Sequence, residues 1–150
     1  MPNLFEPAAR QAIMERLARL TPAATRQWGK MEPAQMLAHC TAAMQVGTGE
    51  LPRKQPFLFK LIAPFARSSF LSEDKPFGKN SPTDPAFVVS DARDFAKEKE
   101  RLTATVQRFC GGGPAEAGRH PHSFLGRITG EQWGIVMYKH LDHHFRQFGA

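Results

Sequence analysis

Histidines are the residues of this sequence whose spacing suggests chemistry. Of the six histidines, three lie close together near the C-terminus: His140, His143 and His144. Side chains four residues apart on a helix lie one turn above each other. Two imidazoles in that arrangement can bind the same metal ion. The pair His140 and His144 is therefore the first candidate for a functional site.

The direction in which this pair faces supports the prediction. On a wheel of about 100° per residue, residues such as Leu141 and Phe145 mark the apolar face of the last helix. His144 points into that face and His140 lies at its edge, whereas His143 falls towards the rim. An imidazole buried there without a partner would cost about 1–3 kcal/mol. The inward pair therefore needs a partner, which a metal ion would supply.

A third ligand is expected from an earlier helix. His39 lies at the edge of that helix's inward face, although a histidine bonded to a carbonyl is the alternative for His39 taken alone. Three neutral imidazoles leave coordination positions open, as catalytic rather than structural sites do. Imidazole suits Zn²⁺, Ni²⁺ and Fe²⁺ alike. We predict that His39, His140 and His144 hold one divalent ion of this group, with an affinity that falls below about pH 6.5.

Four further polar residues are candidates for orienting the ligands or contacting a substrate: Gln35, Gln147, His143 and His122. For the two glutamines the alternative is ordinary surface polarity. Cys40 adjoins His39, but successive helix positions diverge by about 100°, so it is not predicted to be a ligand. No catalytic residue can be assigned.

These side chains must be positioned by helices. Prolines at first-turn positions, a Thr129–Gln132 capping box and a stop at Gly111 to Pro114 mark helix ends. Four long segments have helical periodicity: Pro7 to Leu20, Pro33 to Gly47, Asp91 to Cys110 and Thr129 to Phe148. The apolar segment Phe57 to Phe70 predicts an extra short helix, or one kinked at Pro64.

Two long loops complete the expected fold, Leu71 to Ser90 and Ala115 to Ile128. Within the first, Phe87 to Val89 is the only candidate strand. The pattern predicts an all-α fold, an antiparallel four-helix bundle that forms one domain over residues 1–150. Loops of this length are often functional, and these could cover a site at one end of the bundle.

The composition excludes several classes of protein. The 150 residues carry a net charge of +6, but the basic residues are scattered and lack interleaved aromatic residues, so no nucleic-acid partner is expected. No run approaches the roughly 18 apolar residues of a membrane span, so no membrane partner is expected either. Two cysteines, Cys40 and Cys110, indicate buried reduced thiols. With no export signal apparent, a cytoplasmic location is predicted.

The histidine pattern resembles the DinB-like superfamily of metal-binding four-helix bundles. The residues that carry the resemblance are MLAH, ending at His39, and HLDHHFRQF, from His140 to Phe148. The loop His120-Pro121 … Phe124-Leu125-Gly126 ahead of Trp133 is similar to that of one uncharacterised branch. By position, His39, His140 and His144 match the family's metal triad. In that branch aromatic residues usually follow His-Pro directly, whereas His122-Ser123 intervenes here, so the role of this loop stays open.

The resemblance implies a metal-dependent enzyme that binds a small molecule. Some members of the superfamily look like transferases that use the metal to activate a low-molecular-weight thiol, and a thiol S-transferase acting on a small electrophile is the implied function. The alternative is a non-catalytic ligand-binding or stress-related assembly protein. The four phenylalanines of Phe57 to Phe70 could accordingly line a substrate pocket, form a homodimer interface or belong to the core.

Overall fold

Five α-helices and one 3₁₀ helix build the fold in the computed structural model, which describes residues 2–72, 75–81 and 83–150. Their bounds are α1 (Pro7–Arg19), α2 (Pro33–Gly47), α3 (Phe57–Leu71), η1 (Pro85–Phe87), α4 (Phe95–Ala117) and α5 (Gly130–Gln147). No strand occurs within these described ranges. The predicted all-helical bundle is confirmed, whereas the candidate strand at Phe87 is wrong, because Pro85 starts a 3₁₀ turn there that Asp84 caps.

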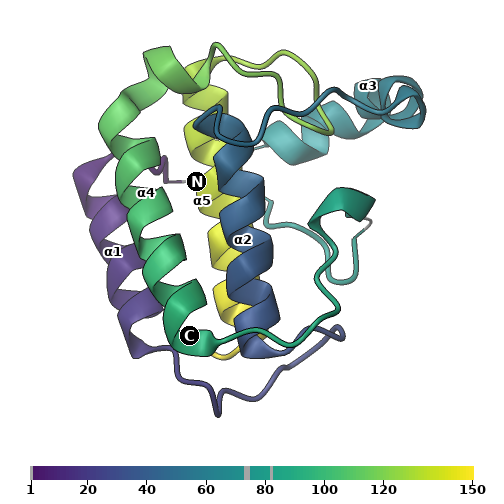
Figure 1. Cartoon of the computed structure of the whole chain (residues 1–150). Coiled ribbons are helices and arrows are strands. Elements are labelled where there is room, and N and C mark those ends of the chain that lie inside the picture. Colours follow the sequence, from purple (N-terminus) through teal and green to yellow (C-terminus); the bar gives the residue numbers. More distant parts are fainter. Residues whose placement is uncertain (1, 73–74, 82) are drawn as a thin grey trace.

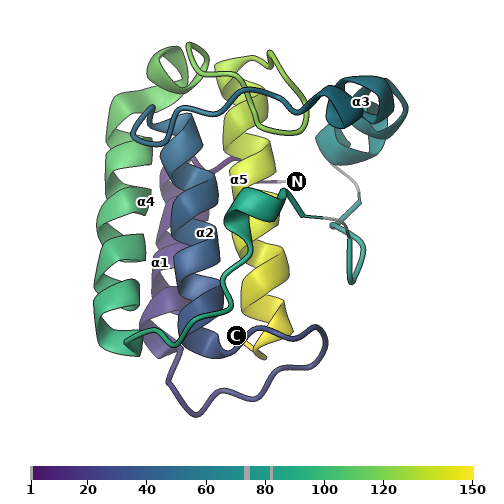
Figure 2. The same cartoon turned by 45° about the vertical axis from the view of Figure 1, so that its right-hand side comes forward.

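The bundle consists of α1, α2, α4 and α5, and α3 lies beside it (Figure 1). Helices α1 and α2, which are consecutive in the chain, run in opposite directions, as do α4 and α5 (Figures 1 and 2). Helices α2 and α4 run parallel, because the long connection that contains α3 and η1 returns the chain to the end where α2 began. This connection covers one side of α2 and α5, where η1 packs against α2 and α3 against α5.

Helix α2 is the most deeply buried element. It packs against α4, α5 and η1, and its apolar side chains are therefore buried around most of the helix, including Met36, Leu37, Cys40 and Met44. Helix α5 instead buries one stripe, formed by Trp133, Met137, Leu141 and Phe145. The two helices that carry the histidines are thus held on both sides of a common core.

Most predicted helix ends agree with the structure. Helix α5 begins after Thr129, and the predicted capping box forms, since Gln132 N donates to Thr129 Oγ1 at 3.2 Å and Thr129 N to Gln132 Oε1 at 2.9 Å. Pro7 and Pro33 occupy first-turn positions. Helix α3 continues past Pro64 to Leu71, and with 15 residues it is as long as α2, so the prediction of a short helix is wrong.

Helix α4 differs from its prediction at both ends. It begins after Asp94 and not at the predicted Asp91, because the carboxylate of Asp94 caps the helix by accepting the Lys97 N–H at 2.9 Å. At the other end Gly113 breaks the helix with φ 72°, but Pro114 starts a further turn that reaches Ala117. The first residue of a helical turn makes no intrahelical hydrogen bond through its N–H, so proline is tolerated there. Pro114 can therefore start a new turn directly after the break at Gly113.

Neither cysteine is in a disulfide. Cys40 is buried and Cys110 is only half-buried, so the prediction of two buried thiols is correct for Cys40 alone. None of the helices in the described part of the chain is both long and apolar enough to cross a bilayer.

Candidate metal centre

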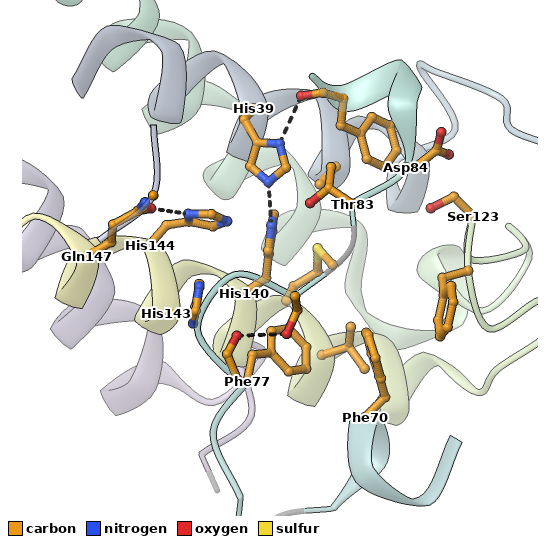
Figure 3. A pocket seen from close by; sticks show the side chains of 18 of the residues that line it. His39, Phe70, Phe77, Thr83, Asp84, Ser123, His140, His143, His144 and Gln147 are labelled. Atoms are coloured by element: carbon orange, nitrogen blue, oxygen red, sulfur yellow. Dashed lines mark hydrogen bonds between the residues drawn. The ribbon is translucent and has the colours of Figure 1, made fainter. Parts of the chain in front are cut away.

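Three histidines from two helices converge on one point. His39 comes from α2, and His140 and His144 come from successive turns of α5 (Figure 3). The three ring centroids lie 4.7–5.0 Å apart. One ring nitrogen of each residue lies within 4.8 Å of the corresponding nitrogens of the other two. The tertiary structure therefore brings together the three residues that the sequence singles out, in a group that could hold a metal ion.

Hydrogen bonds to the far side of two rings fix the direction of their lone pairs. The Phe87 carbonyl lies 3.0 Å from His39 Nδ1, and Gln147 Oε1 lies 2.9 Å from His144 Nδ1. Both oxygens can only accept, so we assign the ring proton to Nδ1 in each case. Nε2 of both residues then presents a lone pair to the centre, which is the usual arrangement of ligand histidines.

Gln147 is itself held in one orientation. Its Nε2 donates to the Trp28 carbonyl at 2.7 Å, which leaves Oε1 to accept from His144 (Figure 3). The side chain is buried, with 3% of its surface exposed. The amide thus connects the loop between α1 and α2 to the histidine cluster.

His140 is the ring whose environment is incomplete. Its Nε2 lies 2.9 Å from His39 Nε2, whereas its Nδ1 is buried and has no hydrogen-bond partner among the described residues. Because His39 Nε2 is an acceptor, one proton of His140 must lie between the two nitrogens. Two nitrogens bound tetrahedrally to one Zn²⁺ are about 3.3 Å apart, given Zn–N bonds of about 2.0–2.1 Å. If the two nitrogens moved apart by a few tenths of an ångström, a metal ion could take the place of this proton. The three histidines therefore fit a metal ion.

All three rings are neutral, the state that binds metal. Burial lowers the pKa of His39, lowers that of His144 to about 3, and lowers that of His140 well below 6.5, with the neighbouring imidazoles adding to the shift at each ring. Protons therefore compete less for these nitrogens than for ordinary histidines. For a metal bound here, burial would therefore move the loss of metal to a pH below the value of about 6.5 predicted from the sequence.

A cavity of about 210 Å³ opens beside the three histidines. Its wall is rich in aromatic rings, among them Trp28, Phe70, Phe77 and Phe124. Both long loops contribute to it, as predicted. However, the segment with η1 crosses the side of the bundle between α2 and α5 (Figure 2). Because this segment supplies part of the cavity wall, the cavity lies on that side of the bundle and not at one end.

The remaining candidates fall into two groups. His143 lines the cavity at its rim, with its ring 5.5 Å from that of Trp28 and 5.0 Å from that of His144. Burial lowers its pKa below the ordinary value, although a hydrogen bond to the Phe77 backbone acts in the opposite direction. Gln35 is outside the cavity: its Oε1 accepts the Glu32 N–H at 2.9 Å and its Nε2 donates to the Asp91 carbonyl at 3.1 Å. The role predicted for Gln35 at the site is therefore wrong.

His122 lines the cavity but acts within its own loop. Its Nδ1 accepts the N–H groups of Phe124 and Leu125 at 3.0 and 3.1 Å, which closes a tight turn between His122 and Gly126. Burial lowers its pKa to about 4. His120 makes a separate contact with Glu116 and lies outside the cavity. Of the two loop histidines, His122 is thus the one near the site.

Several parts of the site were not predicted from the sequence. The Phe87 carbonyl and the Trp28 carbonyl are backbone groups, which no side-chain pattern can reveal. Asp84 is a buried carboxylate on the cavity wall, paired with Arg53 at 3.0 Å. Asp-Pro at positions 84 and 85 is a helix-start signal that could have been recognised.

Comparison with known proteins identifies a family. A family model described as "Protein of unknown function (DUF1569)" matches residues 5–150. Neither the curated proteins nor the solved structures give a match. The matched segment includes both helices of the histidine cluster, both long loops and the whole cavity wall. The chain belongs to the DUF1569 family of proteins of unknown function.

Proposed function

We propose that this protein binds one divalent metal ion through His39, His140 and His144, and that the ion presents a small molecule inside the adjoining cavity. The observation that carries the proposal is the convergence of the three ring nitrogens within 4.8 Å at the wall of an aromatic cavity. The resemblance to the DinB-like superfamily supports the same ligand set. Zn²⁺, Ni²⁺ and Fe²⁺ are all compatible with imidazole ligands.

The charge of the site favours an anionic molecule. The three imidazoles are neutral, and the Asp84 carboxylate on the cavity wall is paired with Arg53. A bound divalent ion would keep its two positive charges and would lower the pKa of a thiol or a water molecule in an open coordination position. A low-molecular-weight thiol, bound as its thiolate, is therefore our proposed first substrate.

The reaction we propose is transfer of that thiol to a small electrophile. The thiol loses its proton, its sulfur forms a bond to the electrophilic carbon, and the leaving group departs with the electron pair of the broken bond. His143 lines the same cavity and is neutral at pH 7, so it can accept the proton. The aromatic wall excludes water and accommodates an apolar electrophile.

Metal content tests the first step. Protein purified without an affinity tag should carry about one equivalent by mass spectrometry, and the triple variant His39→Ala, His140→Ala, His144→Ala should carry none. His120→Ala is the matched control, because His120 lies outside the cavity. No metal in the wild type after reconstitution with Zn²⁺, Ni²⁺ and Fe²⁺ would refute the site.

A spectroscopic titration tests the second step. Ni²⁺- or Co²⁺-loaded protein should change its absorption spectrum when a small thiol binds. If metal binds but no thiol changes the spectrum, the result favours the alternative function. In that alternative the protein holds a small apolar ligand and catalyses no reaction. The aromatic wall of the cavity is the observation that supports this alternative.

A further inference from the structure

Helix α3 has an apolar face that the rest of the described chain does not cover. Phe57 is 76% exposed, Leu58 61%, Leu61 55% and Phe65 86%. At about 100° per residue these four side chains fall within about 100° of one another on the helix. Large apolar side chains scattered singly over a surface are ordinary, whereas a continuous stripe of them marks an interaction surface.

The opposite face of α3 already has its partner. Phe59 and Phe70 each lie 4.9 Å from the ring of Phe124, and Ala63 is buried. The Nζ of Lys139 donates to the carbonyls of Ser69, Phe70 and Ser72 at 2.8–3.1 Å, which fixes the end of the helix. The exposed stripe therefore does not result from a loosely attached helix. Helix α3 is anchored on one side and projects from the bundle with the other (Figures 1 and 2).

Helix α3 and the residues that lead into it carry charge of one sign, and the acidic Glu73 and Asp74 come only after the helix has ended. Residues 51–72 contain four basic residues, Arg53, Lys54, Lys60 and Arg67, and no acidic residue. Arg53 is paired with Asp84, whereas Lys54 and Lys60 are exposed. Arg67 donates to the Leu125 and Arg127 carbonyls at 3.3 Å, and both of these partners are uncharged. An apolar stripe flanked by cations is complementary to an anionic lipid surface, which offers hydrocarbon beneath a layer of phosphate.

The same charge disfavours a second copy of the chain as the partner. In a symmetric dimer each copy contributes the same face, so the lysines of one α3 would approach those of the other. Helix α3 itself contains no carboxylate to pair with them, and each chain has a net charge of +6. Helix α3 is also too short to cross a bilayer, at 15 residues against the roughly 20 required, so it would lie in the plane of the surface.

We infer that the exposed face of α3 docks on the surface of an anionic membrane, with Leu61 and Phe65 inserted among the lipids and Lys54 and Lys60 on the phosphates. This inference is independent of the proposed metal chemistry. The lack of a spanning segment, on which the prediction of no membrane partner rests, does not exclude a helix that lies on the surface.

Sedimentation with vesicles tests the inference. The wild-type protein should sediment with vesicles of phosphatidylglycerol and phosphatidylcholine, and much less with phosphatidylcholine alone. Leu61→Ser with Phe65→Ser should lower the affinity at least tenfold, since each side chain loses its burial in the lipid. Val88→Ser is the matched control, because Val88 is an apolar residue 64% exposed outside α3. Circular dichroism checks that each variant is folded.

Charge substitutions separate docking by α3 from attraction by net charge. Lys60→Gln should weaken binding to the anionic vesicles about fivefold, and Lys54→Gln together with Lys60→Gln about 25-fold. Lys97→Gln, on α4, removes the same charge and should change the affinity little. Equal losses for Lys60→Gln and Lys97→Gln would overturn the inference. So would wild-type protein that does not sediment with anionic vesicles at low salt, or a dimer in analytical ultracentrifugation that Leu61→Ser with Phe65→Ser dissociates.

Discussion

The buried histidines should make the metal-free protein markedly less stable in mild acid. Burial lowers the pKa of His144 from 6.5 to about 3 and that of His122 from 6.5 to about 4. Below about pH 6.5 the unfolded chain takes up protons at both residues, while the folded chain does not. Protonation therefore favours the unfolded state, and stability is lost as the pH falls from about 6.5 towards 4 and 3.

The size of this loss follows from the same values. Between pH 7 and pH 5, each of these two histidines should cost about 2 kcal/mol of unfolding free energy, or about 4 kcal/mol together. His39 and His140 add to it in the same direction, since burial lowers their pKa values too. Small domains are stable by about 5–15 kcal/mol, so the effect is large.

Urea unfolding at pH 7 and pH 5, in the presence of a chelator, measures the loss. His122→Asn is the informative variant, because an amide oxygen can still accept the N–H groups of Phe124 and Leu125 that His122 Nδ1 accepts. This substitution should reduce the loss of unfolding free energy between pH 7 and pH 5 by about 2 kcal/mol. A wild-type loss below about 1 kcal/mol, or the same loss in His122→Asn, would refute neutral burial of these rings.

Three substitutions test other parts of the structure. Gln147→Leu removes the acceptor of the His144 Nδ1 proton and should weaken metal binding about 10–100-fold, as calorimetry would measure; an unchanged affinity would contradict the assigned role. Lys139→Met removes three hydrogen bonds to the end of α3 and should speed amide hydrogen exchange there, with α1 exchanging as before. Gly134→Ala would place a Cβ 1.9 Å from Asn3 Oδ1, so it should destabilise by about 1–3 kcal/mol in thermal unfolding despite the better helix propensity of alanine.

The sequence alone determined the helices and the direction of the histidines. Helical periodicity, the first-turn prolines Pro7 and Pro33 and the cap at Thr129 are local signals, so the positions of α1, α2 and α5 could be predicted closely. The side of α5 on which His140 and His144 lie follows from the helical repeat. The choice of His39 as their partner also drew on a resemblance to known bundles.

Only the tertiary structure decided how these elements meet. The distance from His39 to the α5 pair depends on packing between helices about 100 residues apart in the chain, which no local signal encodes. The orientation of the His39 and His144 rings depends on the backbone carbonyls of Phe87 and Trp28. Every residue type has a backbone carbonyl, so the sequence does not reveal these contacts. Gln35 shows the reverse case: its helix position suggested the site, but its amide caps α2 at Glu32 and donates to the Asp91 carbonyl instead.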